Sequence, residues 1–371
     1  MRVGLIVNPV AGLGGKVALK GSDGQAIQDQ AMRMGAKKEA SLKTLLVLEK
    51  LLEFRNSVTF YTVAGEMGEA ITRSLGFESI VLYVPDSEQT DSRDTKMAAQ
   101  KMLSIPVDLL IFTGGDGTAR DIFSVVKDRV PVFGIPGGVK IHSGVYANSL
   151  TDASRGLRQC FQHPIHTEEA SVMDIDEELF REGVVSAKRY GTLHVPRLTR
   201  IMQNPKAASY QSEDDVMGVF HEVSDRLSRL PADTQIVWGT GGTIYHVMMH
   251  LGLEGSLLGV DVSCCGELVM KDVTESQLRD ILIDKDTILI TGVIGGQGHI
   301  FGRGNVQLSP QVLRLIGPEN MWIVATIEKI RHLTKHQLRV DTPDFEFNES
   351  ITGYRPIIVG WQRELICEIV T

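Results

Sequence analysis

The sequence predicts an α/β protein with a Rossmann-like, parallel-sheet N-terminal domain and a second, mixed α/β domain. Three observations support this: strand and helix patterns alternate through the first half of the chain, glycine-rich turns stand where predicted strands end, and the pattern changes after Asn148. Such alternation is typical of a parallel sheet covered by helices on both faces. The two domains are expected at residues 1–150 and 151–371.

The first half contains apolar and β-branched runs that predict strands. These runs lie at residues 3–7, 58–63, 79–84, 107–112 and 130–134. Between them, apolar residues at helical spacing predict helices. The predicted helices lie at residues 41–54, 66–74, 95–103 and 117–126. Residues 20–40 show weak periodicity, which predicts a long loop or a frayed helix.

The second half begins with short alternating runs at residues 171–176 and 183–187, which predict antiparallel strands. From about residue 234 the alternation of strands and helices resumes. Strands are predicted at residues 235–238, 256–261, 287–293 and 321–326, and helices at residues 245–251, 275–282 and 310–316. The second domain is therefore expected to contain an α/β element of its own.

Composition excludes several classes of protein. Hydrophobic residues make up 43% and charged residues 23%, an ordinary globular balance. The net charge of −8 and the lack of a basic block argue against nucleic acid as a partner. The four cysteines show no framework spacing, which fits a reducing compartment. No signal-peptide pattern and no apolar run of ~18 residues is present, so we expect a cytoplasmic protein with no membrane partner.

The most informative pattern is an apolar strand that leads into Gly-Gly-Asp-Gly-Thr and then a helix. Glycines let the backbone approach phosphates, and amides at a helix N-terminus supply partial positive charge. The candidate phosphate-binding residues of this run are Gly114, Gly115, Gly117 and Thr118. Asp116 would repel a phosphate unless it acts on a hydroxyl or on Mg²⁺, so it is a candidate general base. The alternative is a plain glycine turn with Asp116 as the helix N-cap.

Two further glycine-rich stretches stand in the second half. Residues 239–243 follow a predicted strand and precede a predicted helix, so they form either a phosphate site or a tight turn. Residues 292–304 include Arg303, which can clamp a phosphate in a forked contact or be a surface arginine of a structural hairpin. The candidate nucleotide-binding residues here are Gly241, Gly242, Thr243 and Arg303.

An acidic protein that binds a triphosphate needs cations close to it. Lys16 and Lys20 flank the turn that follows the first strand, and Lys140 follows the Pro-Gly-Gly-Val turn after the fifth. We prefer Lys140, because its turn follows the strand that comes next in sequence after the one leading into Asp116. Asp121, one and a half helical turns further on, is expected to be exposed. The sequence leaves the metal ligands open.

These motifs resemble those of a known superfamily. Gly-Gly-Asp-Gly-Thr after an apolar strand is similar to the signature of NAD kinases, diacylglycerol and sphingosine kinases and 6-phosphofructokinases. Asn8-Pro9-Val10-Ala11-Gly12 resembles the Asn-Pro-x-x-Gly turn of the NAD kinase-like and lipid kinase branches, and residues 130–138 resemble the next strand and glycine turn of NAD kinases. Residues 257–261 and 294–305 resemble the predicted ATP-NAD kinase family that includes acetoin-catabolism-associated proteins. The resemblance covers nearly the whole chain.

The resemblance carries specific expectations. Asp116 matches the catalytic acidic residue of NAD kinases, which activates the 2′-hydroxyl of the adenosine ribose. Phosphate-binding positions are matched by Asn8, Gly12, Thr118 and the glycines around Asp116. It implies phosphorylation of NAD by ATP or polyphosphate, Mg²⁺ as cofactor, nucleotides as substrates, and a possible homo-oligomer. One departure stands out: NAD kinases bind the nicotinamide nucleotide with a downstream Asn-Glu or Asn-Asp pair, and this chain has no convincing equivalent.

Two alternatives stay open. The first is a kinase for another hydroxyl acceptor, a lipid or a small polyol; the Asn-Pro-x-x-Gly turn fits that branch equally, but no membrane-facing amphipathic segment is evident. The second is a nucleotide or NAD sensor without catalysis, against which the presence of Asp116 argues. The phosphoryl donor also stays open between ATP and polyphosphate.

Overall fold

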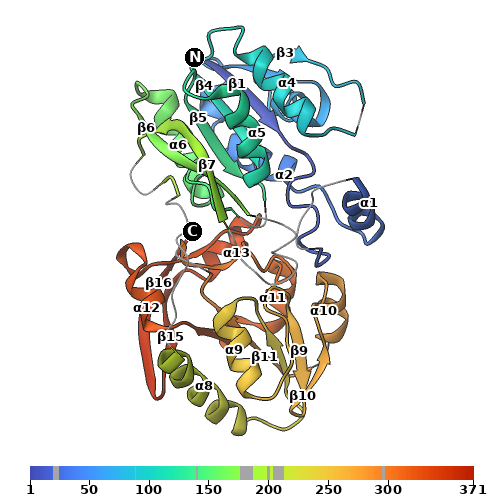
Figure 1. Ribbon diagram of the computed structural model, residues 1–371, viewed down its shortest axis with the longest axis vertical. Helices are drawn as coiled ribbons and strands as arrows, with labels where there is room; N and C mark the ends of the chain where they lie inside the picture. The colour runs from blue at the N-terminus through green and yellow to red at the C-terminus, as the bar shows by residue number, and fades with distance from the viewer. Residues whose placement is uncertain are drawn as a thin grey trace. The chain divides into compact units, whose positions relative to one another are not determined.

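The computed structural model describes residues 1–19, 25–87, 89–138, 141–175, 187–198, 201–203, 213–283, 285–294 and 297–371. The chain divides into two compact units, Met1–Leu13 with Gly21–Lys206 and Gly14–Lys20 with Ala207–Thr371. The first contains a parallel sheet and the second a mixed sheet (Figure 1). The predicted fold class is therefore confirmed.

The first unit is built on a five-stranded parallel sheet in the order β3-β2-β1-β4-β5. Its strands are β1 (Arg2–Val7), β2 (Thr59–Val63), β3 (Glu78–Tyr83), β4 (Leu109–Gly114) and β5 (Val132–Pro136). All five predicted strands are present, with ends shifted by one or two residues. The strand order reverses between β1 and β4, and ligands of such sheets bind beyond the carboxyl ends of the strands at a reversal.

Helices flank this sheet in two layers, as right-handed crossovers require when the strand order runs both ways from β1. The helices are α1 (Gln25–Arg33), α2 (Ala40–Glu49), α3 (Glu69–Ser74), α4 (Ser92–Met102), α5 (Asp116–Val126) and α6 (Leu150–Gln162). Helix α4 packs on α5, whereas α2 packs on α3 and α6. The predicted loop or frayed helix at residues 20–40 contains α1, and its residues 20–24 lie outside the described chain.

An antiparallel ribbon of β6 (Thr167–Ile175) and β7 (Ala187–Pro196) follows α6. The predicted antiparallel pairing is present; the described second strand begins at Ala187, and residues 183–186 of the predicted run lie outside the described part. Helix α5 is tied to the ribbon by an ion pair of 2.9 Å between Arg120 and Asp174.

The expectation that Asp121 is exposed was wrong. Its side chain is buried on α5 and forms an ion pair of 3.1 Å with Lys96 of α4. Since α4 packs against α5, this face of the helix is turned toward protein rather than solvent.

The second unit contains a nine-stranded mixed sheet in the order β10-β9-β8-β11-β13-β15-β16-β14-β12. Its strands are β8 (Gln235–Trp238), β9 (Asp261–Cys264), β10 (Glu267–Met270), β11 (Thr287–Gly292), β12 (His299–Phe301), β13 (Met321–Val324), β14 (Leu338–Val340), β15 (Gly353–Gly360) and β16 (Arg363–Val370). Strands β8, β11, β13 and β15 run parallel. The carboxyl ends of these four strands therefore share one edge.

The predicted strand at residues 256–261 was wrong, because strand pairing begins only at Asp261. The buried carboxylate of Asp261 accepts hydrogen bonds from the backbone N–H and the hydroxyl of Ser256 and from the backbone N–H of Asp272. These contacts hold the preceding residues in an irregular loop, in which Val260 is buried while Leu257 and Leu258 are half-buried.

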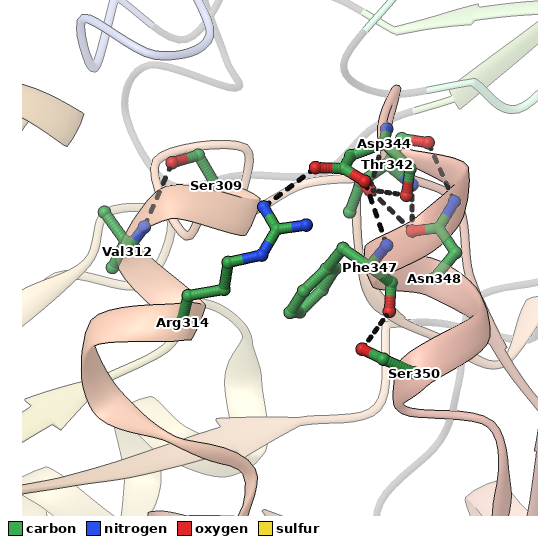
Figure 2. Close-up of polar contacts among 8 residues, drawn as sticks. All are labelled: Ser309, Val312, Arg314, Thr342, Asp344, Phe347, Asn348 and Ser350. Atoms are coloured by element: carbon green, nitrogen blue, oxygen red, sulfur yellow. Dashed lines mark hydrogen bonds and ion pairs between the residues drawn. The ribbon is translucent and has the colours of Figure 1, made fainter.

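The helices of the second unit are α8 (Glu213–Ser228), α9 (Gly242–His250), α10 (Glu275–Ile281), α11 (Pro310–Ile316), α12 (Ile327–Arg331) and α13 (Phe345–Ser350). Figure 2 shows how α13 begins: the carboxylate of Asp344 accepts from the backbone N–H of Phe347 at 2.9 Å and pairs with Arg314 of α11 at 2.8 Å. Over the residues that the structure describes, we find no helix with the length and apolar character needed to cross a bilayer.

Candidate functional site

Three turns of the first unit meet where β1, β4 and β5 end. The side-chain amide of Asn8, after β1, donates to the hydroxyl of Thr118 at 2.9 Å. The backbone N–H groups of Gly137 and Gly138, after β5, both donate to the carbonyl of Gly114 at 2.9 Å. Because these strands are neighbours in a parallel sheet, their carboxyl ends bring the sequence-predicted residues Asn8 to Gly12 and Gly114 to Thr118 together with the Pro-Gly-Gly turn.

The turns need glycines at these positions because they pack so closely that a side chain would clash with the neighbouring turn. A Cβ on Gly12, whose φ is +76°, would lie 2.6 Å from the carbonyl oxygen of Gly137. A Cβ on Gly138 would lie 2.8 Å from the Cα of Gly115. Gly115 and Gly117 are the half-buried members of their turn, so part of its backbone remains accessible.

Asp116 is buried, 5% exposed, as the first residue of α5. The N-cap of this helix is Gly115, so the alternative in which Asp116 is the N-cap was wrong. The Asp116 carboxylate instead accepts from the backbone N–H groups of His142 at 2.7 Å and Ser143 at 3.0 Å, and it lies 3.0 Å from Nδ1 of His142.

His142 was missed by the sequence analysis, although it stands only four residues beyond the Pro-Gly-Gly turn. A signal was present: a His-Ser pair within an otherwise apolar run beside a candidate phosphate turn. Lys140, the preferred cation, lies outside the described residues, so its role stays a prediction.

A second missed residue is Lys43 on α2. Its side chain is buried, and its Nζ donates to the carbonyl of Gly137 at 3.4 Å. The neighbouring Thr44 hydroxyl lies 2.7 Å from the hydroxyl of Thr113, at the end of β4. Apolar residues at helical spacing predicted this helix, but Leu42 is 46% exposed and Lys43 is buried. The helix thus directs an ammonium group toward the meeting turns.

The other two lysines named from the sequence are Lys16 and Lys20. Lys16 belongs to the second unit, where it pairs with Glu275 at 3.3 Å and its carbonyl accepts from the Glu275 backbone at 3.0 Å. Lys20 lies outside the described residues.

In the second unit, the predicted glycine turn connects β8 to α9. Gly241, with φ of +113°, is the N-cap of α9. The hydroxyl of Thr243 accepts from Nζ of Lys329 at 2.8 Å, and the hydroxyl of Thr240 donates to the carbonyl of Gly304 at 3.2 Å. The structure therefore brings the two glycine-rich stretches of the second half together, and Lys329, which is buried on α12, is a cation that the sequence analysis did not find.

Arg303 is buried, so the interpretation as a surface arginine was wrong. Its Nε and Nη2 lie 3.0 and 2.9 Å from Oδ2 of Asp341, which follows β14. The guanidinium thus already engages a carboxylate, and the clamping of a phosphate by Arg303 stays a prediction.

Comparison with known proteins identifies two family domains in this chain. Residues 3–165 match the model of the ATP-NAD kinase N-terminal domain, and residues 233–367 match that of the ATP-NAD kinase C-terminal domain. No curated protein is matched by this chain.

Among solved structures, a candidate diacylglycerol kinase from Bacillus anthracis str. Sterne is similar at 17% identity over 47% of this chain and 45% of its own, with a TM-score of 0.25. A further diacylglycerol kinase of that organism is similar at 15% identity over 52% of this chain and 61% of its own, with a TM-score of 0.25. Each match covers less than two thirds of the relative's length. The two domain models together span most of the sequence, and the chain belongs to the ATP-NAD kinase family, a family of NAD kinase-like phosphotransferases.

Proposed function

We propose that this chain is a cytoplasmic kinase that transfers a phosphoryl group from ATP, or from polyphosphate, to the 2′-hydroxyl of NAD and so forms NADP. The observation that carries the proposal is the meeting of three turns beside Asp116, whose carboxylate is buried. Phosphoryl transfer asks a protein mainly to position the reactants and stabilise charge, together with a group that orients or deprotonates the nucleophile. The phosphate-binding turns would position the reactants and stabilise charge, and the single carboxylate of Asp116 would orient or deprotonate the nucleophile.

Phosphate binding is assigned to the turns themselves. The N–H groups in the first turn of a helix have no partner within the helix and attract anions. In α5 this turn contains Gly117 and Thr118, with Asn8 and Gly12 on the adjoining turn. The buried ammonium of Lys43 supplies positive charge at the Gly137 side, which a protein of net charge −8 needs near a triphosphate.

Mg²⁺ is expected to arrive with the nucleotide. Within the described residues no group of three or more metal-ligating side chains occurs, and Asp116 is the single acidic residue of the three turns. This donor set fits Mg²⁺, which commonly takes one or two carboxylates and completes its shell with water and substrate phosphates. When bound, the ion would offset charge on the transferring phosphoryl group.

In the second unit, we assign nucleotide contacts to Gly241, Gly242, Thr243 and Arg303. The turn has the same design as the first, a strand end followed by a helix N-terminus, and Lys329 adds a buried ammonium at Thr243. Anion binding at such a turn follows from the helix dipole and the free N–H groups.

The test is an assay of NADP formation from NAD with ATP and, separately, with polyphosphate. The purified chain is compared with Asp116→Asn and with Asp128→Asn, which removes an exposed carboxylate just beyond the same helix. We expect NADP with at least one donor, a loss of about 10²-fold or more in Asp116→Asn, and an unchanged rate in Asp128→Asn. No NADP from either donor, or an undiminished rate in Asp116→Asn, would rule out the proposal.

Parallel assays with diacylglycerol and small polyols test the acceptor. Phosphorylation of one of these compounds in place of NAD would show that the proposed acceptor is wrong, while the proposed kinase centre would stand. The homo-oligomer that the family resemblance implies is tested by light scattering of the purified chain.

A further inference from the structure

A cavity of about 250 Å³ lies between β13 and β15 in the second unit. The ladder that joins these two strands consists of two residue pairs, at Ile323 and Val324 of β13. One step earlier, the register brings Pro356 of β15 opposite Trp322 of β13, and a proline has no N–H to donate to a neighbouring strand. The strands therefore separate toward their amino ends, and the cavity occupies the space between them.

The walls of this cavity are mostly apolar and come from both faces of the sheet. Ile323, Ile351 and Ile369 belong to the core on one face. Ile358 belongs to the core on the other face, against which Trp322 packs. Successive residues of a strand point to opposite faces, so a gap between two strands is lined from both. An apolar group placed there would be removed from water on two sides, which is favourable.

The size of the cavity restricts what it can hold. Its volume of about 250 Å³ equals that of about eight water molecules in the liquid. A ligand is therefore limited to on the order of ten non-hydrogen atoms. The exposed lining residues Pro318, Glu319 and Pro356 mark where the cavity opens to solvent.

One of the two arginines that line the cavity already has anionic partners. Arg226 of α8 pairs with Glu222 at 2.8 Å and with Glu364 at 2.6 Å. Its guanidinium also lies over the ring of Trp322, 5.8 Å from the ring centroid. Arg226 therefore closes the α8 side of the cavity, and its charge is balanced within the protein.

Arg355 differs, because no residue that the structure describes pairs with it. Its side chain lines the cavity and is half-buried, and within the described part of the chain it makes no hydrogen bond or ion pair. Glu319 is exposed and directs its carboxylate back over Gly317, where a Cβ would collide with it. A guanidinium presents a planar fork that binds a carboxylate through two parallel hydrogen bonds. The cavity thus combines apolar walls with one cation that is available to an anionic group.

We propose that this cavity binds a small monocarboxylate, with its apolar body between β13 and β15 and its carboxylate on Arg355. One carboxylate follows from the one available guanidinium, and the apolar body follows from the isoleucine-rich walls. The site lies at the amino ends of β13 and β15, whereas the glycine-rich stretches of this unit follow the carboxyl ends of β8 and β11. It is therefore separate from the nucleotide contacts assigned above, and the inference does not rest on the proposed kinase function.

The experiment titrates the full chain with 3-phenylpropanoate, with octanoate and with the neutral 3-phenylpropanamide, and follows binding by saturation-transfer NMR. We expect both acids to bind with a Kd on the order of 0.1 mM, as suits ligands of this size. The amide should bind about tenfold more weakly or worse, because it lacks the charge that Arg355 recognises.

Three variants locate the binding. Arg355→Gln should raise the Kd of both acids about tenfold or more. The matched control is Arg363→Gln, which removes an exposed arginine of β16 and should leave the Kd unchanged. Met321→Trp fills the cavity from β13 and should abolish binding. Saturating ATP should not displace either acid from the parent.

Thermal unfolding shows that each variant is folded before it is titrated, and if Met321→Trp does not fold, the two arginine variants still decide. The proposal is overturned if neither acid binds the parent saturably, if the amide binds as tightly as the acids, or if Arg355→Gln keeps the parental Kd. Equal losses in both arginine variants, or displacement of the acids by ATP, would also overturn it, because the acids would then bind elsewhere. A parent that binds the acids but forms no NADP would refute the proposed function and leave this site standing.

Discussion

Nδ1 of His142 lies 3.0 Å from Oδ2 of Asp116, although 26 residues separate them in the chain. One side chain opens α5 after β4, and the other stands on the loop that follows β5. The contact exists because β4 and β5 are parallel neighbours whose carboxyl ends meet at one edge of the sheet. A substitution in one turn should therefore also affect the neighbouring turns.

Gly12→Ala should destabilise the protein more than Gly35→Ala. Both glycines have positive φ, +76° and +84°, so both changes place an L residue in the left-handed region at a cost of roughly 1–2 kcal/mol. The added Cβ at Gly12 would also lie 2.6 Å from the carbonyl oxygen of Gly137, whereas nothing lies within 4 Å of a Cβ at Gly35. Urea unfolding of both variants measures the difference. Equal losses would show that the first turn relaxes without cost.

Asn8→Ala and Thr118→Val should be energetically coupled. Their side chains share a hydrogen bond of 2.9 Å that links the turn after β1 to α5. Such a bond contributes about 0.5–1.5 kcal/mol, so the double variant should lose less stability than the two single variants together. A double-mutant cycle from urea unfolding gives the coupling energy. Strictly additive losses would mean that the bond does not stabilise the folded chain.

Lys43→Met should weaken ATP binding without unfolding the protein. Its buried ammonium lies beside the Gly137 turn, and hydrogen bonds to charged groups contribute roughly 1.5–3 kcal/mol. We therefore expect the Kd for ATP to rise about tenfold or more, while methionine fills the space of the stem. Calorimetry measures the Kd. The matched control is Lys50→Met, an exposed lysine at the end of the same helix; equal effects of the two changes would remove Lys43 from the phosphate site.

Asp344→Asn should reduce stability at neutral pH and have no effect in strong acid. The Arg314 guanidinium lowers the pKa of the Asp344 carboxyl below its ordinary value of 3.8 in the folded state (Figure 2). Because the folded pKa is the lower one, the charged carboxylate stabilises the fold above pH 3.8, and this stabilisation is lost as the pH falls through the folded pKa. Asparagine retains the helix cap, so the difference isolates the charge.

The size of this effect should be small, about 0.5–1 kcal/mol, because the pair is partly exposed. Urea unfolding from pH 7 down to pH 3 checks it, with Glu346→Gln as the control for an exposed carboxylate of the same helix. A difference between parent and Asp344→Asn that does not shrink with acid would contradict this account.

The elements with strong local patterns could be predicted from the sequence. Strands β1 and β4 are continuous apolar runs because both faces of a central parallel strand are buried. The short strands β12 and β14 were not predicted, since three residues carry no periodicity and their pairing is decided by segments far away in the chain. Strand β16 was not predicted either, because its place in the sheet depends on its pairing with β14 and β15.

Within the candidate site, the glycine turns and Asp116 were visible in the sequence because turn chemistry is local: a strand end, glycines and a helix start stand within ten residues. Lys43 and His142 were not found, because their proximity to Asp116 and its turns depends on β4 lying beside β5 and on α2 packing over their ends. Local residue order determined the elements and the turns. Only the tertiary structure decided which side chains meet, because the lateral order of strands joins residues as far apart as Asn8 and Thr118.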